Sequence, residues 1–512
     1  MDNILEYLDK TTRKNPNKVA IICEERELTF LSLKEAARKI GTTLSEISEP
    51  RKPIIVLMEK EIETICAFLG VVYSGCFYVN VNPSQPIERI KKIIEVSKAE
   101  LIITNQKEFD CETLNFEGKI FQYEEVLAPF GKWKVLSNRR KQSLDIDPLY
   151  CNFTSGTTGV PKGVLVSHRS MIDFMNYFPQ MFEITDADRI GNQAPFDFDV
   201  SAKDIFSCLK TGATMVIIPK KKFSFVTNLL DYIEEKEIST LIWAVSALCL
   251  IVDFKGFKHK IPSKVKKVLF SGEVMPIRYL NIWRNNLPET QFVNLYGPTE
   301  ITCNCTYHIV KGDYKTDQIL PIGRAFPNEK IILINERNEE ITEANVIGEI
   351  CVSGSCLALG YYNDGPQTAK KFIQNPTNQM YYERIYKSGD LGFYDENGNL
   401  FFAGRLDFQI KHMGHRIELE EIEQVLNSFP KVERACCLYD VERSKIILFY
   451  TGQAEINELK TVMRELLPVY MIPAKLYLKD ALPLTNNGKL DRKQMKELYE
   501  QENINDKIKK MV

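Results

Sequence analysis

The sequence lacks the features that mark exported, membrane-inserted or nucleic-acid-binding proteins. Its opening stretch, MDNILEYLDKTTRKN, interrupts the apolar pattern with charges and contains no signal-peptide core. Lysine and arginine together number 66 against 68 aspartates and glutamates, so no excess of one sign attracts nucleic acid or an anionic membrane. We therefore expect a cytoplasmic protein that binds no nucleic acid and does not insert into a membrane.

The chain also lacks a metal-binding pattern of cysteine and histidine. Its 13 cysteines are scattered, with Cys303 and Cys305 one residue apart and Cys436 adjacent to Cys437. None of these spacings is typical of a zinc site, and none of the cysteines has a sequence signature of a nucleophile nearby. We predict reduced thiols.

A long uncharged run is present but does not fit a membrane span. Residues 64–87 contain no charged side chain, yet Ser74-Gly75 divides the run, and its second half alternates and ends at Asn82-Pro83. This pattern predicts a helix followed by a buried strand.

Apolar runs alternate with amphipathic segments through the first three-fifths of the chain. Examples are PIIVLM (53–58), IERIKKIIEVSK (87–98), AELIIT (99–104), TMVIIP (214–219), LLDYIEEKEI (229–238), STLIWAV (239–245), VKKVLFSG (265–272) and QFVNLYG (291–297). Such alternation predicts an α/β fold with mostly parallel sheets covered by helices on both faces. In residues 105–149 the pattern is less regular, and we expect only short strands there.

The pattern changes twice in the last third of the chain. Residues 330–402 are strand-rich, and Asn397-Gly398 is a hairpin signal. After Gly404, alternating helical and strand-like segments form a compact β-α-β-β-α-β-like set. We predict a large domain over residues 1–404, with a β-rich subdomain, and a small α+β domain over residues 405–512.

One glycine-rich stretch, TSGTTGVPKG at residues 154–163, suits phosphate binding. Its glycines let backbone N–H groups approach an anion, its hydroxyls add donors, and Lys162 supplies a positive charge. Pro161 before the lysine and Gly163 after it exclude the usual G-x-x-x-x-G-K-[ST] loop. By composition alone the stretch could equally be a surface turn.

Three polar motifs come at or just after the ends of apolar runs. They are TSGTTG, SGE at 271–273 and YGPTE at 296–300. Because ligands of open α/β sheets bind outside the carboxyl ends of the strands, one cleft could collect all three motifs.

Five motifs in order resemble those of the adenylate-forming enzymes, and within them the amino-acid adenylation domains, especially the D-alanine–carrier protein ligases. They are TSGTTGVPKG, NLYGPTE (294–300), YKSGD (386–390), GRLDFQIKHMGHRIELEEIE (404–423) and NNGKLDR (486–492). Each is weak to moderate alone, but together they span nearly the whole chain.

The resemblance implies an ATP-dependent ligase that releases pyrophosphate, with Mg²⁺ bound by Glu300. Lys489, Glu300 and Thr154 would serve catalysis, and Asp407 would be a hinge about which the small domain rotates. The residues that would hold ATP are Thr154, Ser155, Gly156, Thr157, Thr158, Lys162, Asn294, Tyr296, Thr299, Asp390, Arg405 and Lys489. The oxygen-rich partners suit magnesium and the ribose hydroxyls.

The resemblance also implies an amino-acid pocket headed by Asp199, which would bind the α-ammonium group. Its other members would be Phe198, Val200, Lys203, Trp243, Leu269, Ser271, Leu295, Cys303 and Asn304. Lys203 and Ser271 depart from the D-alanine ligases, which have methionine and cysteine there. D-alanine, serine and aspartate therefore all remain candidate substrates. Alternatively, Lys203 points away from the pocket and pairs with Asp204 or Glu273.

We expect the acceptor to be the phosphopantetheine thiol of a separate carrier protein, and the enzyme to be a monomer. The chain ends soon after the Lys489 motif, which leaves no room for a carrier domain. One alternative is an acyl-CoA ligase for a small carboxylic acid, which would give Asp199 no paired role. Another alternative is a nucleotide-binding sensor or an inactive scaffold. The presence of a suitable residue at every expected catalytic position argues against it.

Overall fold

The computed structural model describes residues 2–127, 134–156, 160–441, 443–484 and 490–509, with only the backbone course for 502–509. The chain divides into two compact units. The larger comprises Met1–Ser84, Ile93–Phe153 and Lys162–Asp407; the smaller comprises Gln85–Lys92, Thr154–Pro161 and Phe408–Val512. The boundary that we predicted after Gly404 stays a prediction.

A nine-stranded sheet of the larger unit has the order β15-β14-β13-β12-β11-β9-β10-β1-β2. Its strands are Arg324–Ala325 (β15), Thr306–Ile309 (β14), Gln291–Tyr296 (β13), Lys267–Ser271 (β12), Thr240–Ala244 (β11), Arg189–Asn192 (β9), Thr214–Ile217 (β10), Val19–Cys23 (β1) and Arg26–Thr29 (β2). The pairs from β13 to β1 are parallel, while β14, β15 and β2 add antiparallel edges. The predicted mostly parallel sheet is confirmed.

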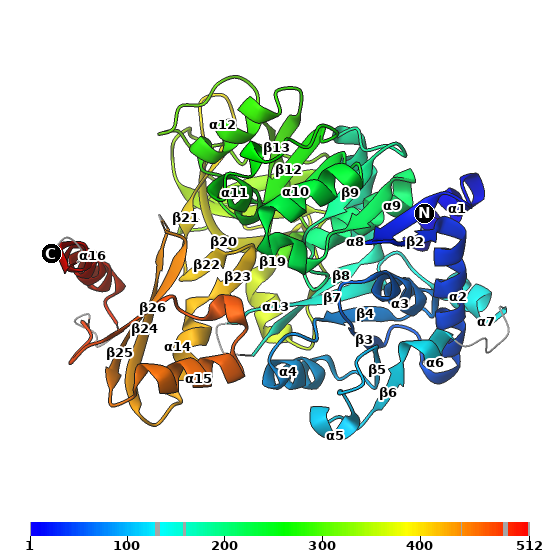
Figure 1. The fold of residues 1–512 in the computed structure, drawn as a ribbon, viewed down its shortest axis with the longest axis horizontal. Helices are drawn as coiled ribbons and strands as arrows, with labels where there is room; N and C mark the ends of the chain where they lie inside the picture. Colours follow the sequence, from blue (N-terminus) through cyan, green and yellow to red (C-terminus); the bar gives the residue numbers. More distant parts are fainter. Residues whose placement is uncertain (1, 128–133, 157–159, 442, 485–489, 510–512) are drawn as a thin grey trace. The chain divides into compact units, whose positions relative to one another are not determined.

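Helices cover both faces of this sheet because its strands bury alternate residues on opposite sides. Ile242 and Leu269 belong to one hydrophobic core, which also takes residues of α1 (Leu5–Lys14), α8 (His168–Met181) and α9 (Val200–Thr211). Leu241 and Phe270 belong to a second core, with α10 (Val226–Glu235), α11 (Val245–Asp253) and α12 (Ile277–Asn286). Figure 1 shows these last three helices in green beside the strands.

A seven-stranded sheet has the order β18-β8-β7-β4-β3-β5-β6 and is also largely parallel. Its strands are Gly360–Tyr361 (β18), Lys162–Ser167 (β8), Pro148–Thr154 (β7), Phe77–Val81 (β4), Pro53–Leu57 (β3), Leu101–Thr104 (β5) and Lys119–Gln122 (β6). The uncharged run is confirmed as helix α3 (Ile62–Tyr73) followed by the buried strand β4.

The expectation of short strands alone in residues 105–149 is wrong. Besides β6 and the start of β7, this stretch forms α5 (Cys111–Leu114), α6 (Tyr123–Leu127) and α7 (Lys134–Gln142). Within Lys134–Gln142, all of which the structure describes, α7 buries Leu136 alone, so the helix leaves almost no apolar periodicity in the sequence.

The strand-rich region forms a five-stranded antiparallel sheet. Its strands are Glu329–Ile334 (β16), Gly348–Gly354 (β17), Phe372–Gln374 (β19), Arg384–Tyr394 (β20) and Leu400–Arg405 (β21). The predicted hairpin joins β20 to β21, and Gly398 in its turn has a positive φ of 71° that favours glycine.

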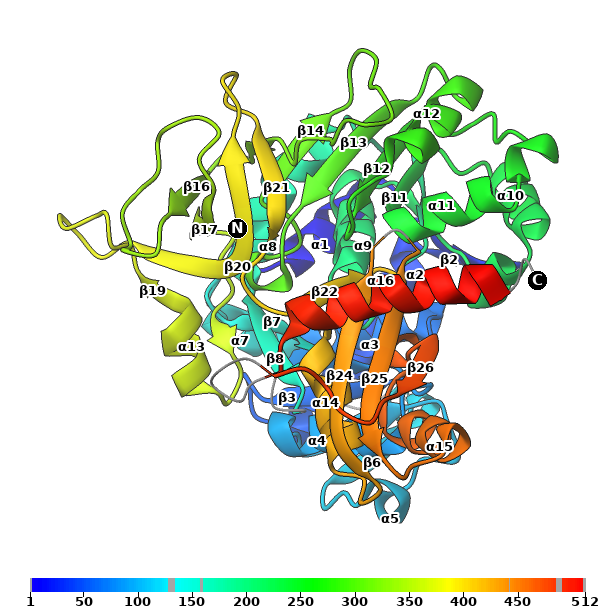
Figure 2. The same cartoon turned by 90° about the vertical axis from the view of Figure 1, so that its left-hand side faces the viewer.

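The smaller unit has a three-stranded sheet of β24 (Val432–Asp440), β25 (Lys445–Gly452) and β26 (Lys475–Leu478). Helices α14 (Leu419–Asn427) and α15 (Ile456–Leu466) pack on one face. Helix α16 (Arg492–Lys509) packs on the other and crosses the strands in Figure 2. The first predicted strand of this set does not join the sheet: it is β22 (Gln409–His412), which pairs with β23 (His415–Glu418) in a separate hairpin.

Two further sequence predictions can be compared with the structure. All 13 cysteines lie in the described residues and are free thiols. Among the described helices, none combines the length and the apolar character that a membrane crossing requires.

Candidate functional site

The polar motifs of the larger unit gather at the carboxyl ends of its parallel strands. Ser271, Ala244 and Tyr296 close β12, β11 and β13, and the register aligns these three strands side by side. Helix α9 starts shortly after β9, the next strand of the sheet. Residues from distant sequence segments therefore share one edge of the sheet, as the motif positions predicted.

Asp390 is the centre of a buried hydrogen-bond network at this edge. Its side chain is 2% exposed, and one carboxylate oxygen accepts the Tyr296 hydroxyl at 2.5 Å while the other accepts the Arg405 guanidinium. Arg405 also donates to both carboxylate oxygens of Asp407, at 2.6 and 2.9 Å. Burial, and then the Asp390 carboxylate, raise the pKa of the Tyr296 phenol, so that this group stays a proton donor.

Glu300 is a second buried carboxylate and lies in the short 3₁₀ turn Thr299–Ile301 that follows β13. It is 1% exposed, and its Oε1 accepts the Tyr361 hydroxyl at 2.6 Å. Its backbone oxygen accepts the Ala358 amide at 2.9 Å. The contact with Tyr361, which the motifs did not predict, ties this turn to strand β18.

Lys162 reaches the same region through strand pairing. It opens β8, in which Val164 is the register partner of Tyr361, the residue whose hydroxyl contacts Glu300. The Tyr362 amide also donates to the Gly163 carbonyl at 2.7 Å. The lysine and the glutamate of two separate motifs therefore belong to one neighbourhood of the larger unit.

Five of the remaining predicted nucleotide residues fall into three groups. Asn294 is buried and its amide donates to the Pro321 carbonyl at 2.8 Å, so it holds a loop. In the smaller unit, the Ser155 hydroxyl donates to the Arg416 carbonyl at 2.8 Å and accepts the Glu418 amide at 3.2 Å. Thr157, Thr158 and Lys489 lie outside the described residues.

The predicted amino-acid pocket lies around the first turn of α9. Asp199 is the residue that precedes this helix, and its backbone oxygen accepts the Cys303 thiol at 3.2 Å. Asp199 is half-buried, like Phe198 and Val200, and is not enclosed. The buried members of the predicted lining are Lys203, Trp243, Leu269, Ser271, Leu295, Cys303 and Asn304.

Lys203 is enclosed completely and donates to the Asn304 side-chain oxygen at 2.7 Å. This is the single hydrogen bond of Lys203 to the described part of the chain. No carboxylate oxygen there lies within 4.0 Å of its ammonium nitrogen, the limit for an ion pair. Burial lowers the pKa of the ammonium, against opposing influences of Cys303, Asp199 and Asp204. Lys203 therefore hydrogen-bonds Asn304 and contacts neither Asp204 nor Glu273, the two partners of the alternative interpretation, although Asp204 attracts it electrostatically.

Asp204 instead belongs to a neighbouring polar cluster. Its carboxylate accepts the Asn192 amide at 2.6 Å, and burial raises its pKa to about 7. Lys60 donates to the Gln193 carbonyl at 3.0 Å, and burial lowers its pKa to about 8. No member of this cluster forms an ion pair with Lys203 within the described residues.

Trp243 does not join the other lining residues. Its side chain packs in the second core, edge-on to Phe223, and its indole N–H donates to the Gly191 carbonyl at 2.7 Å. Leu269, Leu295 and Cys303 belong to the first core, on the opposite face of the sheet. Because successive residues of a strand point to opposite faces, the neighbours of Trp243 in β11 face the pocket side instead.

The pocket wall contains two features that sequence reasoning missed. Thr302 and Cys303 both have positive φ angles, 58° and 77°, an unfavourable conformation for residues other than glycine. Tyr150 of β7 is fully buried beside Cys303, and burial, followed by the influence of that thiol, raises the pKa of its phenol. Tyr150 lies in the seven-stranded sheet, far in sequence from Cys303, so no local sequence signal links the two residues.

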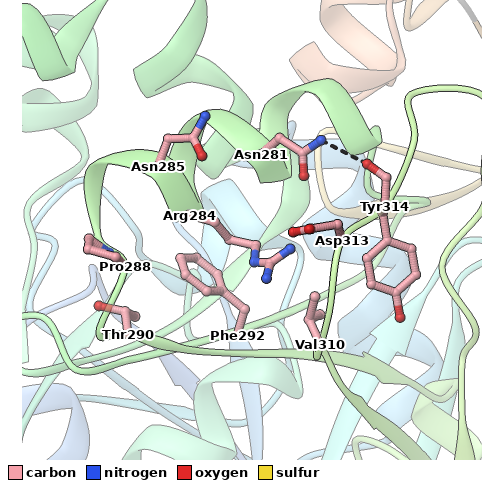
Figure 3. Close-up of a pocket in the computed structure, with 9 residues that line it drawn as sticks. All are labelled: Asn281, Arg284, Asn285, Pro288, Thr290, Phe292, Val310, Asp313 and Tyr314. Atoms are coloured by element: carbon pink, nitrogen blue, oxygen red, sulfur yellow. Dashed lines mark hydrogen bonds between the residues drawn. The ribbon is translucent and has the colours of Figure 1, made fainter.

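A surface pocket of about 450 Å³ lies at the opposite, amino-terminal end of β13 (Figure 3). The lining comprises Asn281, Arg284, Asn285, Pro288, Thr290, Phe292, Val310, Asp313 and Tyr314. No predicted site residue is among them, so this pocket is separate from the strand ends described above.

Comparison with known proteins agrees with these features. A family model described as "AMP-binding enzyme" matches residues 8–362, and one for the "AMP-binding enzyme C-terminal domain" matches residues 421–489. The zwittermicin A synthase ZmaJ of Bacillus cereus is 31% identical over 502 residues, which cover 96% of this chain and 94% of that protein.

Of two other similar proteins, one is much longer than this chain and the other has a solved structure. Gramicidin S synthase 1 of Brevibacillus brevis is 30% identical over 505 residues, 96% of this chain, and the chain spans only 44% of that protein. The structure of holo-PA1221, an NRPS protein containing adenylation and PCP domains, gives a TM-score of 0.83 at 25% identity and covers 96% of this chain and 84% of that one. The predicted fold class is confirmed, and the chain belongs to the AMP-binding family of adenylate-forming enzymes.

Proposed function

We propose that this protein activates an amino acid with ATP and then transfers it to the phosphopantetheine thiol of a separate carrier protein. The observation that carries the proposal is the gathering, in one unit, of the Asp390–Arg405–Tyr296 network, the Glu300 carboxylate and the start of α9 with Asp199. Its relatives include synthases and an NRPS protein with adenylation and PCP domains, which supports an amino acid as the substrate. A cytoplasmic location and a monomeric state belong to the same proposal.

In the first step a carboxylate oxygen of the amino acid attacks the α-phosphorus of ATP, and the bond to the β-phosphate oxygen breaks. Pyrophosphate leaves and an aminoacyl-adenylate remains. We assign Lys162, Thr154, Ser155, Gly156, Thr157 and Thr158 to the phosphates, and Lys489 to the charge that develops during attack. Asp390 and Arg405 would hold the ribose hydroxyls, with Tyr296, Asn294 and Thr299 beside the base and phosphates.

Glu300 fits a magnesium ion because it is a buried carboxylate, and carboxylate oxygens are ligands that Mg²⁺ prefers. The ion would offset negative charge on the phosphate oxygens. The Tyr361 hydroxyl holds Oε1 of this carboxylate at 2.6 Å and so fixes its orientation.

In the second step the carrier thiol loses its proton and its sulfur attacks the carbonyl carbon. AMP leaves with the bonding electron pair, and a thioester forms. Asp407 is the last residue of the larger unit, which suits the proposed hinge. An acyl-CoA ligase remains the alternative, but it gives no role to the carboxylate of Asp199.

Amino-acid-dependent exchange of labelled pyrophosphate into ATP tests this proposal. We expect exchange with at least one amino acid, and Asp199→Ala should raise the KM for the amino acid far more than the KM for ATP. Equal effects on both constants would remove Asp199 from ammonium binding. Absence of exchange with every amino acid, in both enantiomers, would contradict the proposed function.

A further inference from the structure

The buried ammonium of Lys203 has no carboxylate within ion-pair distance among the described residues. It is 0% exposed, and its hydrogen bond goes to a neutral amide, the Asn304 side chain. Removing an ammonium from water is costly unless an opposite charge or several hydrogen bonds compensate for it. Asp199 and Asp204 act on this ammonium only without direct contact. A positive charge with no directly bonded counter-ion at the proposed ligand site indicates that the ligand supplies one.

The orientation of the Asn304 amide indicates which group would bind the negative charge of the ligand. Lysine can only donate hydrogen bonds, which identifies the Asn304 atom beside Lys203 as the amide oxygen. The NH₂ group of Asn304 therefore points away from Lys203, and no residue in the described ranges accepts a hydrogen bond from it. Lys203 thus stands behind an amide whose donor end is available to an acceptor group.

The spacing along α9 adds a second argument. Asp199 and Lys203 are four residues apart, and Asp199 already has helical backbone angles, with φ −61° and ψ −22°. Residues four apart lie on the same face of a helix, one turn or about 6 Å along its axis. The face therefore presents a carboxylate and a positive charge in succession, separated by about the length of one amino acid.

We propose that the substrate is an amino acid with a carboxylate side chain. This inference rests on the proposed function, in which Asp199 binds the α-ammonium group. The NH₂ of Asn304 donates to the side-chain carboxylate, and Lys203, as a positioning residue, supplies the favourable potential and fixes the amide orientation. D-alanine offers no negative group to this pair, and serine offers only a neutral hydroxyl.

The test compares aspartate with asparagine, and glutamate with glutamine, in pyrophosphate exchange by the wild-type enzyme. Each pair has nearly the same shape and differs in charge. We expect kcat/KM for the acidic member of at least one pair to exceed that of its amide about 100-fold, because a site built for one polar group rejects its analogue strongly. Lys203→Met should reduce this ratio to near one.

Lys210→Met is the matched control. It removes a lysine from the same helix, but one whose ammonium donates to the Met175 carbonyl at 2.6 Å, outside the pocket lining. It should leave the ratio unchanged, so a similar loss in both variants would contradict the positioning role of Lys203. If Lys203→Met does not fold, Asn304→Leu removes the proposed donor and should also abolish the preference.

The outcomes separate the two proposals. If asparagine, serine or D-alanine supports exchange as well as the acidic amino acids do, the inference is wrong while the amino-acid ligase remains. If no amino acid supports exchange, the proposed function itself fails.

Discussion

Two lysines with little solvent exposure lie at opposite ends of the nine-stranded sheet, Lys267 with 16% of its side chain exposed and Lys203 with none. At the amino-terminal end, the Lys267 ammonium contacts both carboxylate oxygens of Asp188 at 2.9 Å. Asp188 also accepts the hydroxyls of Ser239 and Thr240. At the carboxyl-terminal end, Lys203 is more deeply buried, yet its one hydrogen bond to a residue that the structure describes goes to the neutral side chain of Asn304.

We interpret this difference as one between a structural lysine, Lys267, and a lysine that serves the proposed substrate site, Lys203. Around Asp188 every charge has a partner inside the chain, as folding stability requires. Lys203 breaks this rule at the end of the sheet where ligands bind, and such violations are expected at functional sites. The strained backbone at Thr302 and Cys303 marks the same end.

The largest effect on stability should come from Lys267→Met. Its removal takes the cation away from the buried Asp188 carboxylate, but Lys267 itself is partly exposed, so we expect a loss of about 1.5 to 3 kcal/mol in the free energy of unfolding. Urea denaturation at pH 7 measures this loss. A loss of less than about 1 kcal/mol would show that the ion pair contributes little to stability.

The pH dependence of the Lys267→Met effect provides a check. Burial opposes ionisation of Asp188, but hydrogen bonds from the Thr185 amide, Lys267 and Ser239 outweigh it and lower the pKa of the carboxyl. A carboxyl with a lowered pKa contributes stability above its unfolded pKa of about 4, and this stability is lost as the pH falls through the folded pKa. The difference between wild type and variant should therefore shrink on acidification.

Asn304→Asp would give Lys203 a carboxylate partner, as Lys267 has in Asp188. The new carboxylate should pair with Lys203 and repel an acidic side chain of the substrate, and we expect kcat/KM for the preferred acidic amino acid to fall about 100-fold. The thermal midpoint should not fall, because a buried charge gains a partner. Unchanged selectivity in pyrophosphate exchange would place Asn304 outside the pocket.

Lys203→Met should have the opposite sign of effect on stability from Lys267→Met. It removes a buried charge that has no directly bonded counter-ion in the described ranges, and replacement of such a group by an apolar one of similar volume is often stabilising, here by about 1 kcal/mol. Urea denaturation of the ligand-free protein measures it. A loss as large as that of Lys267→Met would mean that Lys203 has a structural role and would remove the contrast between the two sites.

Asp204→Asn should give the smallest change in stability. The gain from removing a buried carboxylate is offset because Lys60 and Lys203 lose a nearby negative charge. Burial raises the pKa of Asp204 to about 7, so ionisation costs the folded state stability as the pH rises from about 4 to about 7. The thermal midpoint of the variant, relative to wild type, should therefore be higher at pH 8 than at pH 5, with selectivity unchanged. A strong loss of stability at both pH values would make Asp204 the counter-ion of Lys203.

Much of the fold could be predicted because apolar periodicity is a local property. The alternating segments became the two parallel sheets, and the Asn397-Gly398 turn became the β20–β21 hairpin. Helix α7 escaped prediction because it buries little, and its segment shows no amphipathic pattern. Strand β22 looked like a sheet member because sequence alone does not reveal the partner of a strand.

The site was less predictable because its geometry depends on tertiary contacts. Motif alignment identified Lys203 and Asn304 separately, but their hydrogen bond joins residues 101 positions apart. Trp243 was assigned to the pocket wrongly, since a shift of one residue along β11 changes the face of the sheet. Tyr150 and Tyr361 carry no motif and were found only through their neighbours, Cys303 and Glu300.

A competition experiment tests the central claim most directly. The wild-type enzyme is given ATP, Mg²⁺ and all proteinogenic amino acids with D-alanine at equal concentration, and hydroxylamine traps the activated amino acid for mass spectrometry. We predict that the hydroxamate of an amino acid with a carboxylate side chain dominates. Dominance of a neutral amino acid would contradict the assignment of Lys203 and Asn304 as the sensors of a negative charge.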